Sequence, residues 1–158
     1  MKLLQPVLLA LLTAASLSAH AKYNGEDRGR PVMPAQVHAK WQNECGSCHV
    51  AYPPGLLPAA SWTKIMSGLD KHFGNDASLA PQDTQEITDY LTKHASNRWN
   101  STAAPLRITE SQWWKSKHDE VRAAVWTRAS VKSRSNCNAC HRDAAQGDFD
   151  EDRVHIPK

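Results

Sequence analysis

Apolar residues along this chain recur at the three- and four-residue spacing of a helix face. The spacing predicts a helix over 35–49, a second that starts at Pro58 and ends at the run 72–74, and a third that Pro81 opens. The positions that form these faces are Val37, Trp41, Cys45 and Cys48, then Trp62, Ile65, Met66 and Leu69, and then Ile87, Tyr90, Leu91 and His94. Strong strand formers are few, so the fold class predicted is all-α, with short helices and long loops.

The later part of the chain is patterned in the same way. Thr109 followed three residues later by Gln112 is a capping-box pattern, which predicts a helix that opens there and continues toward Trp126. A further short helix is expected after Ser130, and Gly147 should stop the turn that follows it. The polar, irregular stretch 97–105 separates two halves. We therefore expect one domain over 22–105 and a second over 106–158.

Two runs of the same form give the chemistry, Cys45-Gly46-Ser47-Cys48-His49 and Cys137-Asn138-Ala139-Cys140-His141. The C-x-x-C-H run is the attachment signature of a c-type haem. On a helical turn both cysteines and the histidine project from one face, so two thioether bonds and one iron ligand reach a single porphyrin. The sequence predicts two haem c groups, attached at Cys45, Cys48, Cys137 and Cys140, with His49 and His141 each supplying one axial ligand.

A zinc site, a thiol redox pair and a disulfide framework are the alternative interpretations of the four cysteines. A zinc site built from two C-x-x-C pairs would not need the two histidines, and a thioredoxin-like dithiol would need only one pair in a βαβ context. Each alternative leaves part of the repeated pattern unexplained.

Residues 1–21 have the pattern of a secretory signal, with Lys2, an apolar run over 3–12 and an ending Ala19-His20-Ala21. The apolar run is shorter than the ~20 residues that a membrane-spanning helix needs. We expect cleavage before Lys22, a periplasmic protein and no stable membrane insertion after cleavage.

The net charge bears on the kind of partner, and the chain length bears on how the core is built. Without the leader the chain has 18 basic and 16 acidic residues, a formal balance of +2 that is too small to indicate a nucleic-acid partner. The remaining 137 residues (158 minus 21) are few for two cores built from side chains alone. We therefore expect the porphyrins to supply apolar surface, with tryptophans packed against them.

The sixth iron position decides between electron transfer and reaction with small molecules, because only an open iron binds oxygen, peroxide or nitric oxide. Met33, Met66, His38, His72, His94, His118 and His155 are the available ligands. We predict His72 for the first haem, because it ends an apolar helix beside Phe73-Gly74. We predict His118 for the second, because it follows Trp113-Trp114 by about one helical turn.

Together these residues resemble the small dihaem cytochrome c (DHC) family. The resemblance rests on both haem runs, on the string Tyr52-Pro53-Pro54-Gly55-Leu56-Leu57-Pro58, and on Trp62, His72-Phe73-Gly74, Trp114 with His118, and Gly147-Asp148-Phe149. It implies a periplasmic electron carrier with bis-histidine irons, whose partners are a small high-spin monohaem cytochrome (SHP) and a membrane cytochrome b. The first half is also similar to a shortened class I cytochrome c, with His72 at the place where that class usually has Met.

The sequence is compatible with three functions. The first is an electron carrier without catalytic residues, which relays electrons between a membrane donor and a soluble haem protein. The second is a dihaem enzyme, peroxidase-like or oxygen-reducing, in which one haem keeps an open site. The third, a haem-based gas sensor, would need an output domain that the sequence does not offer.

Overall fold

The computed structural model describes residues 32–97 and 104–158 of the chain. The expected leader, Trp99 and most of the irregular stretch between the two halves lie outside the described residues. The α-helices are α1 (Ala39–Gly46), α2 (Ala59–Met66), α3 (Pro81–Lys93), α4 (Gln112–Lys117) and α5 (Ala123–Trp126). Short 3₁₀ turns lie at Pro54–Leu56, Leu69–Lys71, Ile108–Glu110, Cys137–Ala139, Ala144–Gln146 and Glu151–Arg153. The described residues form no strand beyond one isolated bridge between His72 and Asn75, so the predicted all-α class is confirmed.

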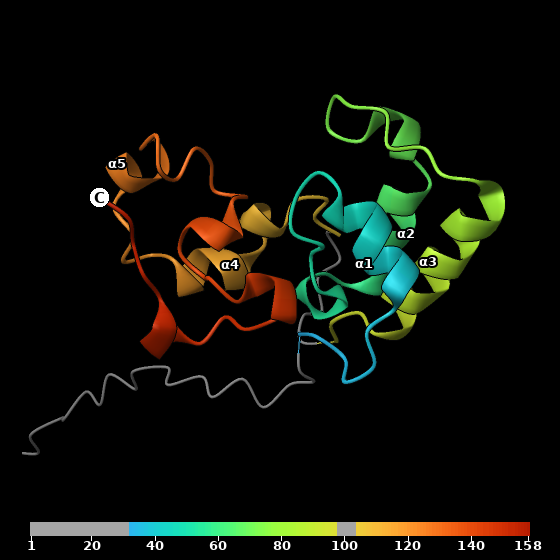
Figure 1. Ribbon diagram of the computed structural model, residues 1–158, viewed down its shortest axis with the longest axis horizontal. Coiled ribbons are helices and arrows are strands. Elements are labelled where there is room, and N and C mark those ends of the chain that lie inside the picture. The colour runs from blue at the N-terminus through green and yellow to red at the C-terminus, as the bar shows by residue number, and fades with distance from the viewer. Residues whose placement is uncertain (1–31, 98–103) are drawn as a thin grey trace, which may run out of the picture.

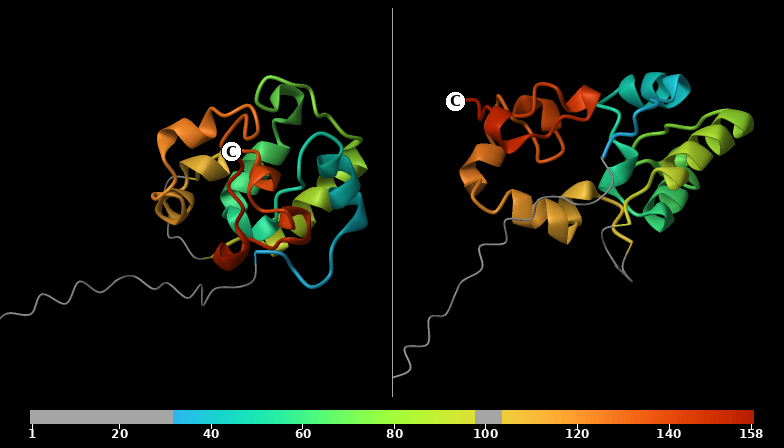
Figure 2. Two further views of the ribbon diagram at one scale, coloured as in Figure 1. Left: turned by 60° about the vertical axis from the view of Figure 1, so that its left-hand side comes forward. Right: turned by 90° about the horizontal axis from the view of Figure 1, so that it is seen from below.

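The two halves of the sequence lie side by side in space. Helices α1, α2 and α3 gather on one side of the molecule, and α4, α5 and the C-terminal turns gather on the other (Figure 1). The same separation is visible from below (Figure 2).

The first half has a core of side chains. The predicted faces of α2 and α3 meet, and Trp62, Met66, Ile87, Tyr90 and Leu91 are all buried there with Trp41 and Leu57. Pro81 occupies the first turn of α3, as predicted. The helix that Pro58 was expected to start ends at Met66, and the chain continues through a separate 3₁₀ turn before His72.

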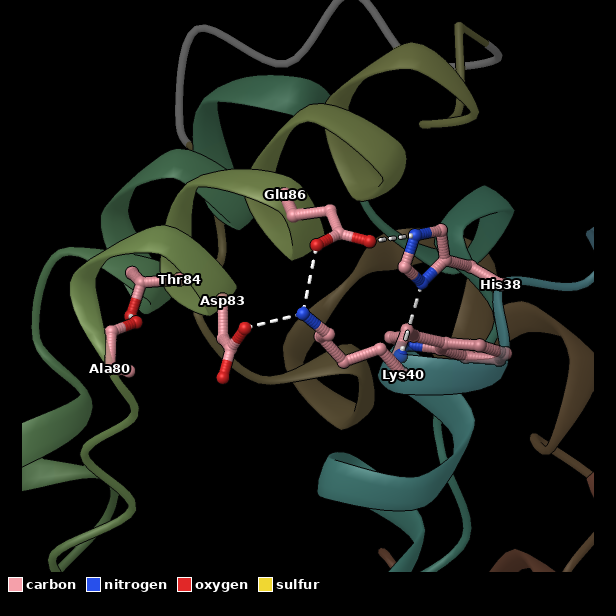
Figure 3. Close-up of polar contacts among 7 residues, drawn as sticks. His38, Lys40, Ala80, Asp83, Thr84 and Glu86 are labelled. Carbon is pink, nitrogen blue, oxygen red and sulfur yellow. Dashed lines mark hydrogen bonds and ion pairs between the residues drawn. The ribbon is translucent and has the colours of Figure 1, made fainter.

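Helix α1 begins later than predicted, at Ala39 and not at residue 35. His38 is its N-cap, with an extended backbone and a ring Nδ1 that accepts a hydrogen bond from the Trp41 amide at 3.3 Å. The other ring nitrogen, Nε2, lies 3.0 Å from a carboxylate oxygen of Glu86 on α3. Lys40 binds Asp83 and Glu86 from the same side, so these contacts join the start of α1 to α3 (Figure 3).

The proline turn over 53–57 links the N-terminal segment, α2 and the end of α3. Trp62 Nε1 donates a hydrogen bond to the buried Pro54 carbonyl at 2.8 Å. The Gly55 amide donates to the Val32 carbonyl, and the Ser96 amide donates to the Leu57 carbonyl, both at 2.9 Å. The turn places two neighbouring leucines in different surroundings, since Leu57 joins the core of the first half and Leu56 lines a cavity in the second.

The capping prediction for the second half is wrong by two residues. The N-cap of α4 is Ser111, whose Oγ accepts a hydrogen bond from the Trp114 amide at 3.2 Å, and Thr109 lies within the preceding 3₁₀ turn. Thr109 is inside that turn, so the extended N-cap conformation is taken by Ser111 and not by Thr109.

The continuous helix toward Trp126 is also wrong. The Trp114 carbonyl, which the His118 amide would use in an α-helix, is 2.8 Å from Nδ1 of the His118 ring. The His118 amide turns instead to the Lys115 carbonyl, and α4 ends at Lys117.

The second haem motif lies on a tight turn and not on the expected helix. A 3₁₀ turn spans Cys137–Ala139, and the His141 amide donates to the Cys137 carbonyl at 2.8 Å. Lys132, with a φ of 70°, interrupts right-handed helical backbone before the motif. Gly147 ends the following turn with a left-handed φ of 79°, as predicted.

The identity of the α4 cap can be tested by a pair of substitutions. Ser111→Ala removes the acceptor for an amide at the helix start and should lower the free energy of unfolding by about 1 kcal/mol. Thr109→Ala should cost less than half as much. Denaturant unfolding of the haem-loaded protein measures both, and equal losses would contradict the assignment.

Candidate haem-binding sites

The first site is formed by His49 and His72, which the structure brings together from opposite ends of α2. Their ring centroids lie 6.2 Å apart and their planes differ by 18°. Nδ1 of His49 is 2.7 Å from the Val50 carbonyl oxygen, so it acts as the N–H donor and leaves Nε2 free to bind a metal.

A sharp turn positions His72. Phe73 and Gly74 have φ values of 50° and 100°, and the Asn75 amide donates to the His72 carbonyl at 3.0 Å, which is the pattern of a type I′ turn. The left-handed backbone conformation of Phe73 costs about 1–3 kcal/mol. The Phe73 ring is covered by the Arg107 guanidinium, which lies 4.2 Å from its centre. Partial burial is the main cause of a lowered pKa of His72, and the neighbouring His49 and Arg107 lower it further. The lower pKa favours the neutral imidazole, which is the form that binds a metal.

The second site is formed by His118 and His141. Their ring centroids are also 6.2 Å apart, and their planes differ by 76°. Trp114 stacks on His118 at 4.3 Å, and Phe149 meets the edge of His141 at 5.2 Å. The bond between His118 Nδ1 and the Trp114 carbonyl that ends α4 also leaves Nε2 as the available ligand atom.

Burial acts on both rings of the second site. Burial lowers the pKa of His118. Burial and, to a smaller extent, the neighbouring His118 lower the pKa of His141. Both imidazoles are therefore held in the neutral form near pH 7.

A cavity of about 680 Å³ opens beside these two histidines. This volume lies within the range of about 300–1,000 Å³ expected for a ligand or cofactor site. Its walls include Cys137, Cys140 and the tryptophans at 113, 114 and 126. Val32, Met33 and Leu56 come from the first half of the chain, so that half completes the pocket of the second motif.

The cysteines do not behave as a zinc site, a dithiol or a disulfide framework. All four are free of disulfide bonds, and the described residues contain no group of three or more His, Cys, Asp or Glu side chains that could hold a metal ion. Burial raises the pKa of the Cys45 and Cys137 thiols to about 11, so neither is poised as a reactive thiolate.

The arrangement fits a haem in each half. A metal–imidazole bond of about 2 Å on each side, plus the distance from each nitrogen to its ring centre, gives a centroid separation of about 6 Å. Both observed separations are 6.2 Å. In each site the two cysteines of the motif lie beside one of the paired histidines in sequence, where they can reach the same porphyrin.

The other candidate ligands are not paired with His49 or His141. His38 caps α1, Met66 is buried in the core of the first half, and the side chain of His155 is exposed. His94 ends α3 with its ring 5.1 Å from that of Tyr90. Met33 packs against Gly147 at the rim of the second cavity.

The sequence matches the family model described as "Dihaem cytochrome c" over residues 41–149, which is more than half of the chain. The chain belongs to the dihaem cytochrome c family. The resemblance seen in the sequence is thereby confirmed, and the protein is an electron-transfer haem protein with two covalently bound c-type haems.

Solved structures of dihaem cytochromes are similar to this chain. The diheme cytochrome c from Rhodobacter sphaeroides is 42% identical, with a TM-score of 0.66 over 72% of this chain and 97% of that one. The diheme cytochrome c of Shewanella baltica OS155 is 44% identical, with a TM-score of 0.68 over 75% of this chain and 92% of that one. Comparison with curated proteins gives no match.

Among residues 32–97 and 104–158, no helix has the length and apolar character needed to cross a bilayer.

Several residues around these sites have contacts that the sequence did not predict. Arg107 lies far in sequence from His72 and was given no role, and Met33 was named only as a possible iron ligand. Leu56, Tyr52 and Phe149 were part of the family resemblance, but their places beside the second cavity, His49 and His141 appear only in the structure.

The unexpected role of Leu56 leads to a prediction. Leu56→Ala removes a wall of the second cavity, so it should shift the spectrum of the haem at His141 although Leu56 follows the first motif. Leu57→Ala is the matched control, because it opens the core of the first half. Each should destabilise the protein by about 2–5 kcal/mol. Paramagnetically shifted haem methyl resonances in the NMR spectrum separate the two, and the same haem responding to both would contradict the geometry.

Proposed function

We propose that this dihaem cytochrome is a periplasmic electron carrier in which both irons have two histidine ligands. His49 and His72 would hold the first haem, and His141 and His118 the second. The observation that supports this proposal is the repeated separation of 6.2 Å between the imidazole rings of each pair.

A haem supplies one-electron chemistry, and the protein decides what else can reach it. A second imidazole closes the sixth position, which leaves no place for oxygen or peroxide. Two neutral imidazoles also favour ferric iron more than a thioether does, and the axial ligands are among the factors that spread haem potentials over roughly 0.8 V. Both haems should therefore be low-spin and of low potential.

The surroundings of each pair keep the rings in place without a large movement on electron transfer. Backbone carbonyls hold His49 and His118, and Trp114 covers one face of His118. Rigid ligands suit a carrier that gains and loses an electron without binding a substrate.

The family resemblance and the leader pattern suggest the partners and the place of action. We propose that the protein acts in the periplasm, accepts electrons from a membrane cytochrome b and passes them to a soluble, high-spin monohaem cytochrome of the SHP type. Anaerobic mixing of the purified proteins, followed by absorption at the haem bands, tests the order of transfer.

Covalent attachment of both haems can be counted directly. The intact protein should keep two haems after denaturing acid extraction, because each motif offers two thiols to the porphyrin vinyl groups. Cys45→Ala combined with Cys48→Ala should keep one. Mass spectrometry of the denatured protein measures the number, and loss of both haems from the intact protein would show that they are not thioether-bound.

The sixth ligands can be tested one haem at a time. His72→Ala should make only the haem at His49 high-spin and able to bind carbon monoxide, and His118→Ala should do so only for the haem at His141. His155→Ala is the control, since that side chain is exposed and should leave both haems low-spin.

Electron paramagnetic resonance and the reduced spectrum with carbon monoxide give the answer. A wild-type protein that already binds carbon monoxide would favour the alternative, a dihaem enzyme with one open iron. A low-spin His72→Ala or His118→Ala variant would refute that ligand assignment.

A further inference from the structure

Tyr52 stands between the two haem sites. It follows the first motif by three residues, and its ring stacks on that of His49, with centroids 4.7 Å apart and planes that differ by 21°. The ring of His49 thus has two aromatic neighbours, Tyr52 at 4.7 Å and His72 at 6.2 Å between centroids.

The hydroxyl of Tyr52 reaches the other half of the protein. It donates a hydrogen bond of 2.7 Å to the Ser135 carbonyl oxygen, which lies two residues before Cys137. The Sγ atom of Cys137 is 3.7 Å from the same oxygen. Once Cys137 is joined to the porphyrin its sulfur has no proton to donate, but the Ser135 carbonyl remains beside it.

The hydrogen bond between Tyr52 and Ser135 crosses from one half to the other beside a cavity. Near Tyr52, the halves face each other across a cavity of about 800 Å³, lined by His49 and Tyr52 on one side and by Lys132, Ser133 and Ser135 on the other. A tyrosine phenol is an O–H donor at neutral pH, so the hydroxyl of Tyr52 can hold the Ser135 carbonyl throughout the neutral range.

We propose that Tyr52 is a positioning residue that couples the two haem sites. Its ring fixes the orientation of His49, and its hydroxyl fixes the loop that bears Cys137, so the separation of the haems is held constant. The inference rests on the proposed electron-transfer function. An electron that passes between the irons oxidises one and reduces the other, and Tyr52 is neither oxidised nor reduced in the step.

The decisive variant is Tyr52→Phe, which keeps the ring stacked on His49 and removes only the bond to Ser135. Tyr90→Phe is the matched control, because it also removes one phenol hydroxyl from the first half, and the ring contacts of Tyr90 are with His38, Trp41 and His94. In the haem-loaded protein, amide hydrogen exchange over residues 132–138 should be about two- to tenfold faster in Tyr52→Phe, the effect of losing one hydrogen bond. It should be unchanged in Tyr90→Phe.

A kinetic measurement tests the coupling itself. In protein reduced by one electron with a light pulse, the rate constant for electron exchange between the haems should fall in Tyr52→Phe and stay at the wild-type value in Tyr90→Phe. Tyr52→Leu should in addition change the electron paramagnetic resonance signal of the haem at His49, because the stacked ring is lost. Tyr52→Phe should leave that signal unchanged.

The outcomes separate this inference from the proposed function. Suppose that the wild-type haems exchange electrons and that Tyr52→Phe has the wild-type rate of amide hydrogen exchange and the wild-type rate of electron exchange. The role of Tyr52 is then refuted and the carrier function stands. If the wild-type haems exchange no electrons, the relay function fails, and the amide exchange still reports on the link to Ser135.

Discussion

In each haem site two imidazole rings lie with their centroids 6.2 Å apart, and one ring of each pair is held by a backbone carbonyl. Nδ1 of His49 bonds to the Val50 carbonyl and Nδ1 of His118 bonds to the Trp114 carbonyl, so the tautomer and the ring direction are set by the nearest turn of the chain. The Trp114 carbonyl that holds the His118 ring is the one that the His118 amide would use in a longer helix, and α4 ends at Lys117.

The two halves support their rings in different ways. In the first, α2 and α3 enclose buried tryptophan, leucine and isoleucine side chains, and the His72 turn is attached to that core. In the second, the buried residues are few, namely Ser111, Trp114, Val125, Val131 and Ala144. The cavity beside His118 and His141 fills much of the remaining space, so the second half depends more on its haem for apolar contact.

This difference bears on the division into two domains, which stays a prediction. Leu56 and Met33 close the second cavity, and Tyr52 bonds to the loop before the second motif. These contacts join the two halves. In our proposal the contact made by Tyr52 also keeps the separation of the two haems constant.

The sequence alone determined the chemistry, since a C-x-x-C-H run requires its residues at fixed spacing within one turn. It also predicted the helical class, the faces of α2 and α3, the Pro81 start and the Gly147 stop, because helical spacing, proline and glycine act locally. The sequence also named His72 and His118 as the candidate sixth ligands. That their rings lie 6.2 Å from those of His49 and His141, that Ser111 and not Thr109 caps α4, and that Leu56 lines the distant site were decided by tertiary structure. These outcomes depend on contacts between residues far apart in the chain, and no local pattern records which partner a side chain will meet after folding.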